Sequence, residues 1–479
     1  MRGDSEAPGI GHYLGFFGAL VLGAGLRLHH ITFQSLWLDE LFSVVFSRSD
    51  LPVAEIIRVY QTDVHPVGYP LLLHCWLGFF GDTDSAARSL SAVLGILGIG
   101  AMYVVGRWAV SARVGLAAAF LTAVNAFHIF YSQEARSYTL VFVFAAFSYL
   151  GLLMLLDKPG PRAVAVWTVA AAAAIHTHYW ALVMLAGQLF AAAAILLFQK
   201  APWRRVWPWA AAVGMVALTM VPWLDPLLKT ARLTDYWPAR PEPFFFVSYF
   251  HTYFGREPLL SLLFAALLVA LPFLLWREDR CGGGDRRVLA AVLGTAITSS
   301  MLLAYLRSVA AVPMLMPRFT FVLLPALFLL FALAIASIPR SAVRWTVVAA
   351  ILAASLVNLA RTGYYTVPRK EQWRDAVKYV LEHPRFEPGS NAFMSPVAPG
   401  FQFYFSQLGS GVVVLDTDPQ VLEQLRERRP APSRIWVLRA RGEEIDADYA
   451  KTLRRYYVRR GNRRFLKTGV ERWEAEGRN

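Results

Sequence analysis

The chain has 479 residues, of which 56% are hydrophobic and only 17% are charged, and its mean hydropathy is positive. Soluble globular chains carry about 25% charged residues, so the composition excludes an ordinary soluble domain and indicates a polytopic membrane protein. The formal net charge is +14. Cytoplasmic loops of membrane proteins concentrate Lys and Arg, which explains this charge without nucleic acid, and no basic stripe with interleaved aromatics indicates a nucleic-acid partner.

Apolar segments long enough to cross a bilayer recur along most of the chain. Because a spanning helix needs about 20 mostly apolar residues, we expect about eleven transmembrane helices. They lie at 10–30, 85–108, 114–131, 137–156, 162–177, 179–199, 205–224, 258–276, 288–308, 318–338 and 342–360. The 162–199 stretch could instead be one re-entrant unit, but the polar run from His176 to Tyr179 favours a turn between two spans.

The basic residues indicate how these spans are oriented. If the N-terminus is cytoplasmic, every short loop on that side carries at least two basic residues, as at Arg107 with Arg113. This is the positive-inside distribution. Three pieces then lie on the outer face, at 31–84, 225–257 and 361–479. We therefore expect a transmembrane domain over 1–360, with 31–84 as its first external loop, and a separate external domain over 361–479.

The external pieces have predictable local structure. In the first loop, Leu51–Tyr60 and Tyr69–Phe80 have helical spacing and are typical of interfacial helices. The 361–479 region alternates two kinds of pattern, which predicts a small α/β domain on an otherwise mostly α protein. Its helix-like stretches are Glu371–Leu381, Val421–Arg428 and Ala447–Tyr457, and its strand-like stretches are Val412–Leu415, Arg434–Leu438 and Arg464–Val470.

An adjacent acid pair, Asp39 and Glu40, lies in the first external loop. Acids at a helix start are often solvated residues that favour the helix dipole. The functional alternative is a carboxylate that accepts a proton from an acceptor hydroxyl as a general base. Ionisable residues at a membrane face are costly to bury and usually functional, so this pair is the leading catalytic candidate.

The same loop ends in Asp63 and His65, and His178 lies on the same predicted face beside Tyr179. Such a group of acids and histidines could bind a divalent metal or a phosphate. No metal-ligand spacing supports a metal ion, so the need for a metal stays open and no other cofactor is expected.

Two further stretches gather polar groups on the outer face. Glu134, Arg136 and Tyr138 join two spans, where the two charged residues could form a local ion pair or a simple polar turn. Arg318 opens a later span from outside, against the usual charge bias, and Arg307 is a second candidate. Arg is suited to hold a phosphate through two hydrogen bonds, although it can also extend to the interface for solvation.

These residues fall within six runs spread over roughly the first 340 residues. The runs are SLWLDE at 35–40, DVHPVGYPLLLH at 63–74, ARSLSA at 87–92, YSQEARSY at 131–138, THY at 177–179 and PRF at 317–319. In order and placement they resemble the GT-C superfamily of membrane glycosyltransferases. More narrowly, they resemble its bacterial family 39-like branch, related to protein O-mannosyltransferases and lipid A aminoarabinose transferase.

The resemblance implies a GT-C fold and an enzyme of the bacterial inner membrane. A sugar carried on a polyprenyl phosphate would pass to an acceptor hydroxyl on the periplasmic face, the acceptor being a glycan, a lipid or a protein. Asp39 would inherit the role of general base, with Glu40 beside it. His65 stands where the aminoarabinose enzymes have Lys near the donor phosphate.

Other site roles follow the same resemblance. Arg318, with His65 or a divalent ion, would stabilise the leaving phosphate, and Arg307 is the second basic candidate. The remaining residues of the matched runs would bind substrate. They are Asp63, Glu134, Arg136, Tyr138, His178 and Tyr179. Relatives often carry an external C-terminal domain, and Lys370–Arg374 resembles its start, whereas the β-trefoil repeats of eukaryotic protein mannosyltransferases are missing from this sequence.

The main alternative is a flippase or transporter of polyprenyl-linked sugars. It predicts helices broken at mid-membrane with polar residues inside the spans. The predicted spans are uninterrupted and their polar residues collect at the outer face, which favours an enzyme. A ligase or polymerase acting on diphosphate-linked oligosaccharides would place its key basic groups in a large late loop.

Overall fold

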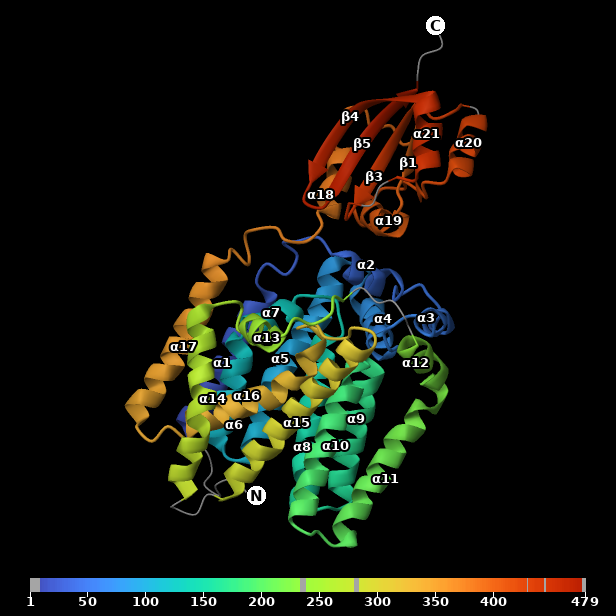
Figure 1. The fold of residues 1–479 in the computed structure, drawn as a ribbon. Coiled ribbons are helices and arrows are strands. Elements are labelled where there is room, and N and C mark those ends of the chain that lie inside the picture. The colour runs from blue at the N-terminus through green and yellow to red at the C-terminus, as the bar shows by residue number, and fades with distance from the viewer. Residues whose placement is uncertain (1–8, 233–237, 280–283, 429, 443–444, 476–479) are drawn as a thin grey trace. The chain divides into compact units, whose positions relative to one another are not determined.

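The computed structural model describes residues 9–232, 238–279, 284–428, 430–442 and 445–475 (Figure 1). Its contacts divide the chain into two compact units. The first unit comprises 1–29, 51–73 and 88–364 and is helical. The second comprises 30–50, 74–87 and 365–479 and contains the sheet.

The first unit is built from helices, most of them apolar, that range from single turns to long spans. These are α1 (Ile10–Leu28), α3 (Val53–Tyr60), α4 (Gly68–Phe80), α5 (Asp84–Ala109), α6 (Ala112–Val124), α7 (Ala126–Ser132), α8 (Tyr138–Asp157), α9 (Pro161–Thr177), α10 (Trp180–Phe198), α11 (Trp203–Met220), η1 (Val221–Trp223), α12 (Leu224–Ala231), α13 (Phe245–Tyr253), α14 (Pro258–Asp279), α15 (Gly284–Ala310), η2 (Phe319–Leu323), α16 (Leu324–Ala336) and α17 (Ser341–Arg361). The ends of α4 and α5 belong to the second unit.

Among the described residues, nine helices are long and apolar enough to cross a membrane, or ten if α6 and α7 together form one span. The one predicted span outside these ten, 162–177, forms α9, which has only 17 residues. The turn expected at His176–Tyr179 is confirmed, since α9 ends at Thr177 and α10 begins at Trp180. The chain is therefore a multi-pass integral membrane protein with the predicted order of helices.

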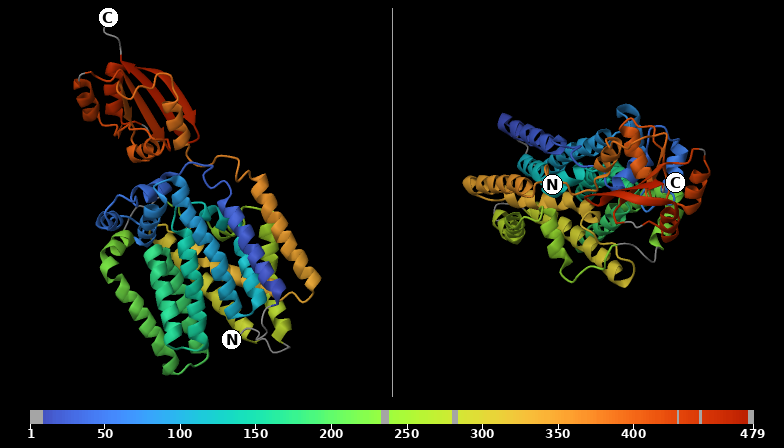
Figure 2. Two further views of the ribbon diagram at one scale, coloured as in Figure 1. Left: turned by 180° about the vertical axis from the view of Figure 1, so that it is seen from behind. Right: turned by 90° about the horizontal axis from the view of Figure 1, so that it is seen from above.

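Burial distinguishes central helices from peripheral ones. The apolar stretch of η2 and α16 is 89% buried, whereas that of α1 is 17% buried and that of α17 is 28% buried. α1 and α17 lie on the outside of the helical unit in both views of Figure 2. Their outward residues are nonetheless apolar, among them Phe17 and Val357. A helix that exposes apolar side chains in this way is suited to lipid rather than water.

The predicted span 114–131 is wrong as a single helix, because the chain bends by 63° between α6 and α7. Asn125 causes the break: its Oδ1 accepts a hydrogen bond from the backbone N–H of His128 at 2.8 Å and so starts α7. Its Nδ2 donates to the carbonyl of Tyr253 at 2.8 Å. The broken helix is thus present, although the sequence predicted uninterrupted spans.

The carbonyls freed by the break have partners. The wholly buried Arg27 donates from Nη2 to Thr122 at 2.7 Å and from Nη1 to Ala123 at 3.0 Å. In an apolar interior each unsatisfied backbone group costs several kcal/mol, so a break in a helix requires such partners. Side chains of the protein itself therefore satisfy this break.

The second unit is an α/β domain with helices on both faces of its sheet (Figure 1). Its elements are α2 (Leu38–Val45), α18 (Trp373–Leu381), β1 (Asn391–Met394), α19 (Ala398–Gln407), β2 (Val414–Leu415), α20 (Pro419–Glu427), β3 (Arg434–Ala440), α21 (Ala447–Tyr456), β4 (Tyr457–Phe465) and β5 (Thr468–Ala475). The strand order is β2-β1-β3-β5-β4, with β1 parallel to β2 and β3, and β5 antiparallel to β3 and β4. Ile435 and Val437 pack with Leu422 and Leu453, while Trp436 on the opposite face contacts His383.

The small α/β domain is confirmed, but one strand was predicted wrongly. Arg464–Val470 is not continuous: β4 ends at Phe465, β5 begins at Thr468, and Lys467 turns the chain with a φ of 55°. Lys rarely adopts this left-handed conformation, so nothing in the residue type indicates a turn here. The structure also adds β1 and α19, which the sequence patterns did not predict.

We expect replacement of Asn125 to destabilise the break between α6 and α7. Asn125→Ala removes both hydrogen bonds and should lower the free energy of unfolding by about 1–2 kcal/mol, the usual range for a lost helix N-cap. Asn125→Ser keeps a cap acceptor but loses the bond to Tyr253, so its thermal midpoint in detergent should lie between the other two. Equal midpoints for the Ser and Ala variants would contradict the capping role.

Candidate functional site

The approach of the first loop to α9 depends on Gly68. A Cβ atom at this position would lie 2.5 Å from the carbonyl oxygen of His176, closer than real Cβ contacts allow. Only glycine therefore lets α4 begin against the end of α9. This contact brings Asp63 and His65, just before α4, next to the turn that carries His178.

A chain of hydrogen bonds joins this loop to the segment between α7 and α8. Asp63 Oδ2 lies 2.8 Å from His65 Nδ1, and His65 Nε2 lies 2.8 Å from Arg136 Nη2. Arg can only donate, so Nε2 must accept and the ring proton sits on Nδ1, where it is donated to Asp63. In this arrangement His65 is neutral and links the carboxylate to the guanidinium.

The backbone of Arg136 is fixed by two residues from other helices. Ser91 Oγ on α5 donates to the Arg136 carbonyl at 3.2 Å, and the Tyr69 hydroxyl on α4 lies 3.0 Å from the same Oγ. Arg136 itself is buried, with 5% exposure. Sequence reasoning assigned no role to Tyr69 or Ser91, although both lie inside the matched runs that begin at Asp63 and Ala87.

His178 is a buried member of the cluster. Its Nδ1 accepts the backbone N–H of Trp180 at 3.1 Å, which leaves the proton on Nε2. That Nε2 is buried and has no hydrogen-bond partner among the described residues. Burial lowers the pKa of His178 to about 3, with further contributions from His65, Arg136 and Arg318. The ring is therefore a neutral N–H donor with an open hydrogen-bonding position.

Arg318 and a group of aromatic rings adjoin His178. Arg318 precedes η2 and lies 5.5 Å from the ring centroid of Phe319, whose centroid is 5.8 Å from that of His178. The rings of Tyr131 and Tyr138 are 4.6 Å apart, and the Tyr138 ring is 5.9 Å from His178. Basic groups and aromatic surfaces thus meet at one end of the helical unit.

Tyr179 and Asp63 influence each other. Burial, and then the charge of Asp63, raise the pKa of the Tyr179 hydroxyl. The hydroxyl oxygen is buried and has no hydrogen-bond partner among the described residues. Burial also raises the pKa of Asp63, but the hydrogen bond from His65 and the charge of Arg136 outweigh it, so the pKa of Asp63 lies below its ordinary value. Asp63 is therefore an ionised acceptor at neutral pH.

Glu134 and Arg307 are the other two site residues that the sequence predicts in this unit, and they lie in different places. Glu134 is buried, and its backbone carbonyl accepts the N–H of Arg136 at 2.7 Å in a tight turn. Arg307, near the end of α15, donates from Nη2 to the carbonyl of Ala231 at 3.3 Å. No contact in the described residues joins Arg307 to His178 or Arg318, so the structure does not bring it to the cluster.

The acid pair belongs to the second unit, in the first turn of α2. Glu40 is fully buried, and its Oε2 accepts the backbone N–H of Trp37 at 3.2 Å and Lys370 Nζ at 2.9 Å. Asp39 is only partly buried. The two neighbouring acids therefore have different environments, one in a buried ion pair and one accessible from outside.

The same unit attaches the start of the C-terminal region to the first loop. Gln34 Oε1 accepts the backbone N–H of Lys370 at 3.0 Å, and Ser35 Oγ accepts that of Arg374 at 3.2 Å. The Arg374 side chain also reaches Asp84 at 3.1 Å. These contacts hold the run at 370–374 beside the segment that leads into the acid pair. Among the described residues no group of His, Cys, Asp and Glu is arranged to hold a metal ion.

Part of the chain matches a known protein family. Residues 64–224, which include the loop from His65 to α4, Arg136 and His178, match the dolichyl-phosphate-mannose-protein mannosyltransferase family. No curated protein sequence matches this chain.

Solved structures share the fold across nearly the whole chain. ArnT from Cupriavidus metallidurans in the apo state is 13% identical with a TM-score of 0.64, covering 96% of this chain and 98% of ArnT. ArnT bound to undecaprenyl phosphate is 14% identical with a TM-score of 0.62, covering 97% and 98%. The archaeal oligosaccharyltransferase AglB from Archaeoglobus fulgidus, in complex with an inhibitory peptide and a dolichol-phosphate, is 11% identical with a TM-score of 0.52, covering 96% and 74%.

The neutral state of His178 makes the stability of the protein depend on pH. The unfolded chain protonates this residue near pH 6.5, whereas the folded chain does so near pH 3. Between these values the unfolded state binds one more proton, so stability falls as the pH is lowered from 6.5. His178→Asn keeps an acceptor for Trp180 but cannot titrate. The loss of thermal stability between pH 7.5 and pH 5 should be smaller in this variant, and an equal loss would contradict a lowered pKa.

Proposed function

We propose that the chain transfers a sugar from a polyprenyl-phosphate donor to an acceptor hydroxyl on the periplasmic face of a bacterial inner membrane. The observation that carries this proposal is the cluster of Arg136, Arg318 and neutral His178 in a membrane fold like that of ArnT. An apolar tail can stay in lipid while such a cluster binds the phosphate. The acceptor would be a glycan, a lipid or a protein.

The charge that develops on the leaving phosphate determines which residues bind it. The sugar–phosphate bond breaks as the acceptor oxygen bonds to the anomeric carbon, so negative charge grows on the departing polyprenyl phosphate. Arg136 and Arg318 remain protonated at any physiological pH and stabilise that charge. The unpartnered Nε2–H of His178 donates a further hydrogen bond to the phosphate. Asp63, Glu134, Tyr138 and Tyr179 complete the substrate-binding residues.

His65 has a different part from the Lys of the aminoarabinose enzymes. Both of its ring nitrogens are engaged, by Asp63 and Arg136. We assign it the orientation of Arg136 rather than a direct bond to phosphate. In this scheme the guanidinium groups of Arg136 and Arg318 supply positive charge to the phosphate.

Asp39 is the proposed general base. It takes the proton of the acceptor hydroxyl, and that oxygen then attacks the anomeric carbon. Glu40 shares the motif, but its buried ion pair with Lys370 commits its carboxylate to structure. The proposal therefore separates a catalytic acid from a positioning acid within two adjacent residues. The positive-inside distribution of basic loops supports the periplasmic assignment of this end.

The acid pair provides a sharp test. Asp39→Asn should lower the rate of sugar transfer by at least about 100-fold, the low end of general-base effects, without changing thermal stability. Glu40→Gln should lower stability by about 3–5 kcal/mol, because it leaves Lys370 partly buried without its anion. Transfer from polyprenyl-phosphate sugars of the native membrane to endogenous acceptors measures the first effect. Near-normal transfer by the Asp39→Asn variant would reject the proposed base.

Donor binding tests the phosphate cluster separately. Arg318→Gln and Arg136→Gln should each weaken binding of undecaprenyl phosphate by about 10- to 100-fold, as expected for hydrogen bonds to a charged group. Arg307→Gln is the comparison, since its guanidinium is held at Ala231. Calorimetric titration in detergent measures all three. Equal loss in the Arg307 variant would show that the phosphate site lies elsewhere.

A further inference from the structure

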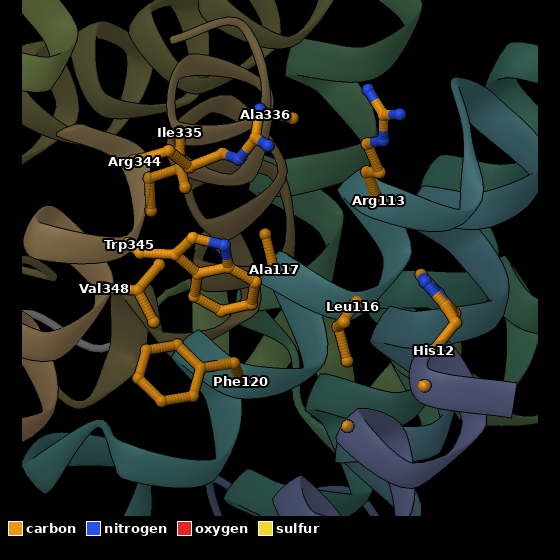
Figure 3. A pocket seen from close by; sticks show the side chains of 12 residues that line it. His12, Arg113, Leu116, Ala117, Phe120, Ile335, Ala336, Arg344, Trp345 and Val348 are labelled. Atoms are coloured by element: carbon orange, nitrogen blue, oxygen red, sulfur yellow. The ribbon is translucent and has the colours of Figure 1, made fainter. Parts of the chain in front are cut away.

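A second candidate site lies at the opposite end of the helical unit. It is a cavity of about 360 Å³ between α1, α6, α16 and α17, drawn in Figure 3. Ile335 and Ala336 line it at the end of α16, whereas Arg318 precedes η2 at the start of the same helical stretch. The 18 residues from Phe319 to Ala336 extend about 27 Å, close to the thickness of a bilayer core. The cavity and the phosphate cluster therefore lie in opposite leaflets.

The cavity combines an apolar wall with cationic groups. Phe120, Val348 and Ala117 contribute apolar surface, and Arg113 and Arg344 are its charged residues. Figure 3 shows the two guanidinium groups on one side of the cavity and the rings of Phe120 and Trp345 on the other. The lining residues include no Asp or Glu.

Neither cation is neutralised within the described chain. Arg344 Nη1 donates to the carbonyl of Ile338 at 3.3 Å, a weak bond to a neutral group. Arg113 is exposed, and no salt bridge of either residue occurs among the described residues. The two arginines lie in the first turns of α6 and α17, where the helix dipoles add positive potential. His12 also lines the cavity, and its buried Nε2 has no hydrogen-bond partner in the described part of the chain.

The position of the cavity identifies the kind of anion. The apolar stretches of α1 and α17 are only 17% and 28% buried, as expected for helices that contact lipid, so a cavity between them and the central helices borders the bilayer. Trp345 is 62% exposed at its edge, and such aromatic residues favour the boundary between headgroups and hydrocarbon. An apolar wall below two arginines matches a phosphate with acyl chains attached, whereas a soluble phosphate would leave the wall unused. Basic pockets between transmembrane helices bind anionic headgroups in this way.

We propose that this cavity binds an anionic phospholipid of the leaflet opposite the transfer site, with its phosphate at Arg113 and Arg344 and an acyl chain against Phe120 and Val348. The lipid joins α1 and α17 to the central helices α6 and α16. The proposal is independent of the transferase reaction, because no residue of the phosphate cluster takes part.

Lipid retention tests the proposal on the full-length protein. The protein is released from nanodiscs of equimolar phosphatidylglycerol and phosphatidylcholine, and native mass spectrometry counts bound lipids. Each arginine near a headgroup contributes about a five-fold gain in affinity, so R113Q/R344Q should retain phosphatidylglycerol about thirty-fold less well. Ala117→Leu, which fills the cavity without changing its charge, should also reduce retention.

The matched control removes two exposed arginines from the first turns of other helices at the same end. R162Q/R204Q changes the charge of α9 and α11 equally but leaves the cavity intact, so phosphatidylglycerol should stay bound. If the double variant R113Q/R344Q does not fold, R113Q alone, at an exposed position, should still reduce phosphatidylglycerol retention.

Four results would overturn the proposal. The first is unchanged phosphatidylglycerol retention in the Arg113 and Arg344 variants. The second is equal retention of phosphatidylcholine, and the third is displacement of the lipid by inorganic phosphate alone. The fourth is displacement by undecaprenyl phosphate in preference to phosphatidylglycerol, which would make the cavity a second site for the polyprenyl carrier.

Discussion

The candidate site depends on keeping the guanidinium of Arg136 charged and fixed inside an apolar helical unit. A buried charge is stable only where hydrogen bonds compensate for the lost water. His65 accepts from Arg136 and donates to Asp63, while Ser91 and Tyr69 hold the Arg136 backbone. Gly68 allows the loop to come close enough for these bonds. Much of the matched 63–74 run therefore serves one cationic side chain.

The sequence predicted the features that local composition determines. A run of apolar residues must be helical in lipid, whatever its neighbours are, so every predicted span has a helix in the structure. The turn at His176–Tyr179 and the helices of the C-terminal region followed from the same local reasoning. The structure brings together four residues of the candidate site that the sequence predicts on one face of the membrane: His65, Arg136, Tyr138 and His178.

Features that depend on distant partners could not be predicted. The break at Asn125 is stable because Arg27, far away in sequence, donates to the freed carbonyls, and the distant Tyr253 carbonyl accepts from the Asn125 side chain. The difference between Asp39 and Glu40 depends on Lys370, more than three hundred residues later. Arg307 and Arg318 both lie at the outer end of a predicted span, so the sequence does not distinguish them. Packing decides which one reaches His178. Arg27 is a charged residue inside the first predicted span, and this position is the signal that could have identified it as a structural residue.

Contacts of Lys370 and Arg374 have a consequence for how this protein can be recombined. Because 30–50 and 74–87 form one unit with 365–479, a hybrid protein that exchanges only the C-terminal region would leave Glu40 facing a foreign residue. Working chimeras must carry the three segments together. Recombination of this chain with another of the same fold should therefore preserve Glu40 and Lys370 as a matched pair, even where the surrounding sequence diverges.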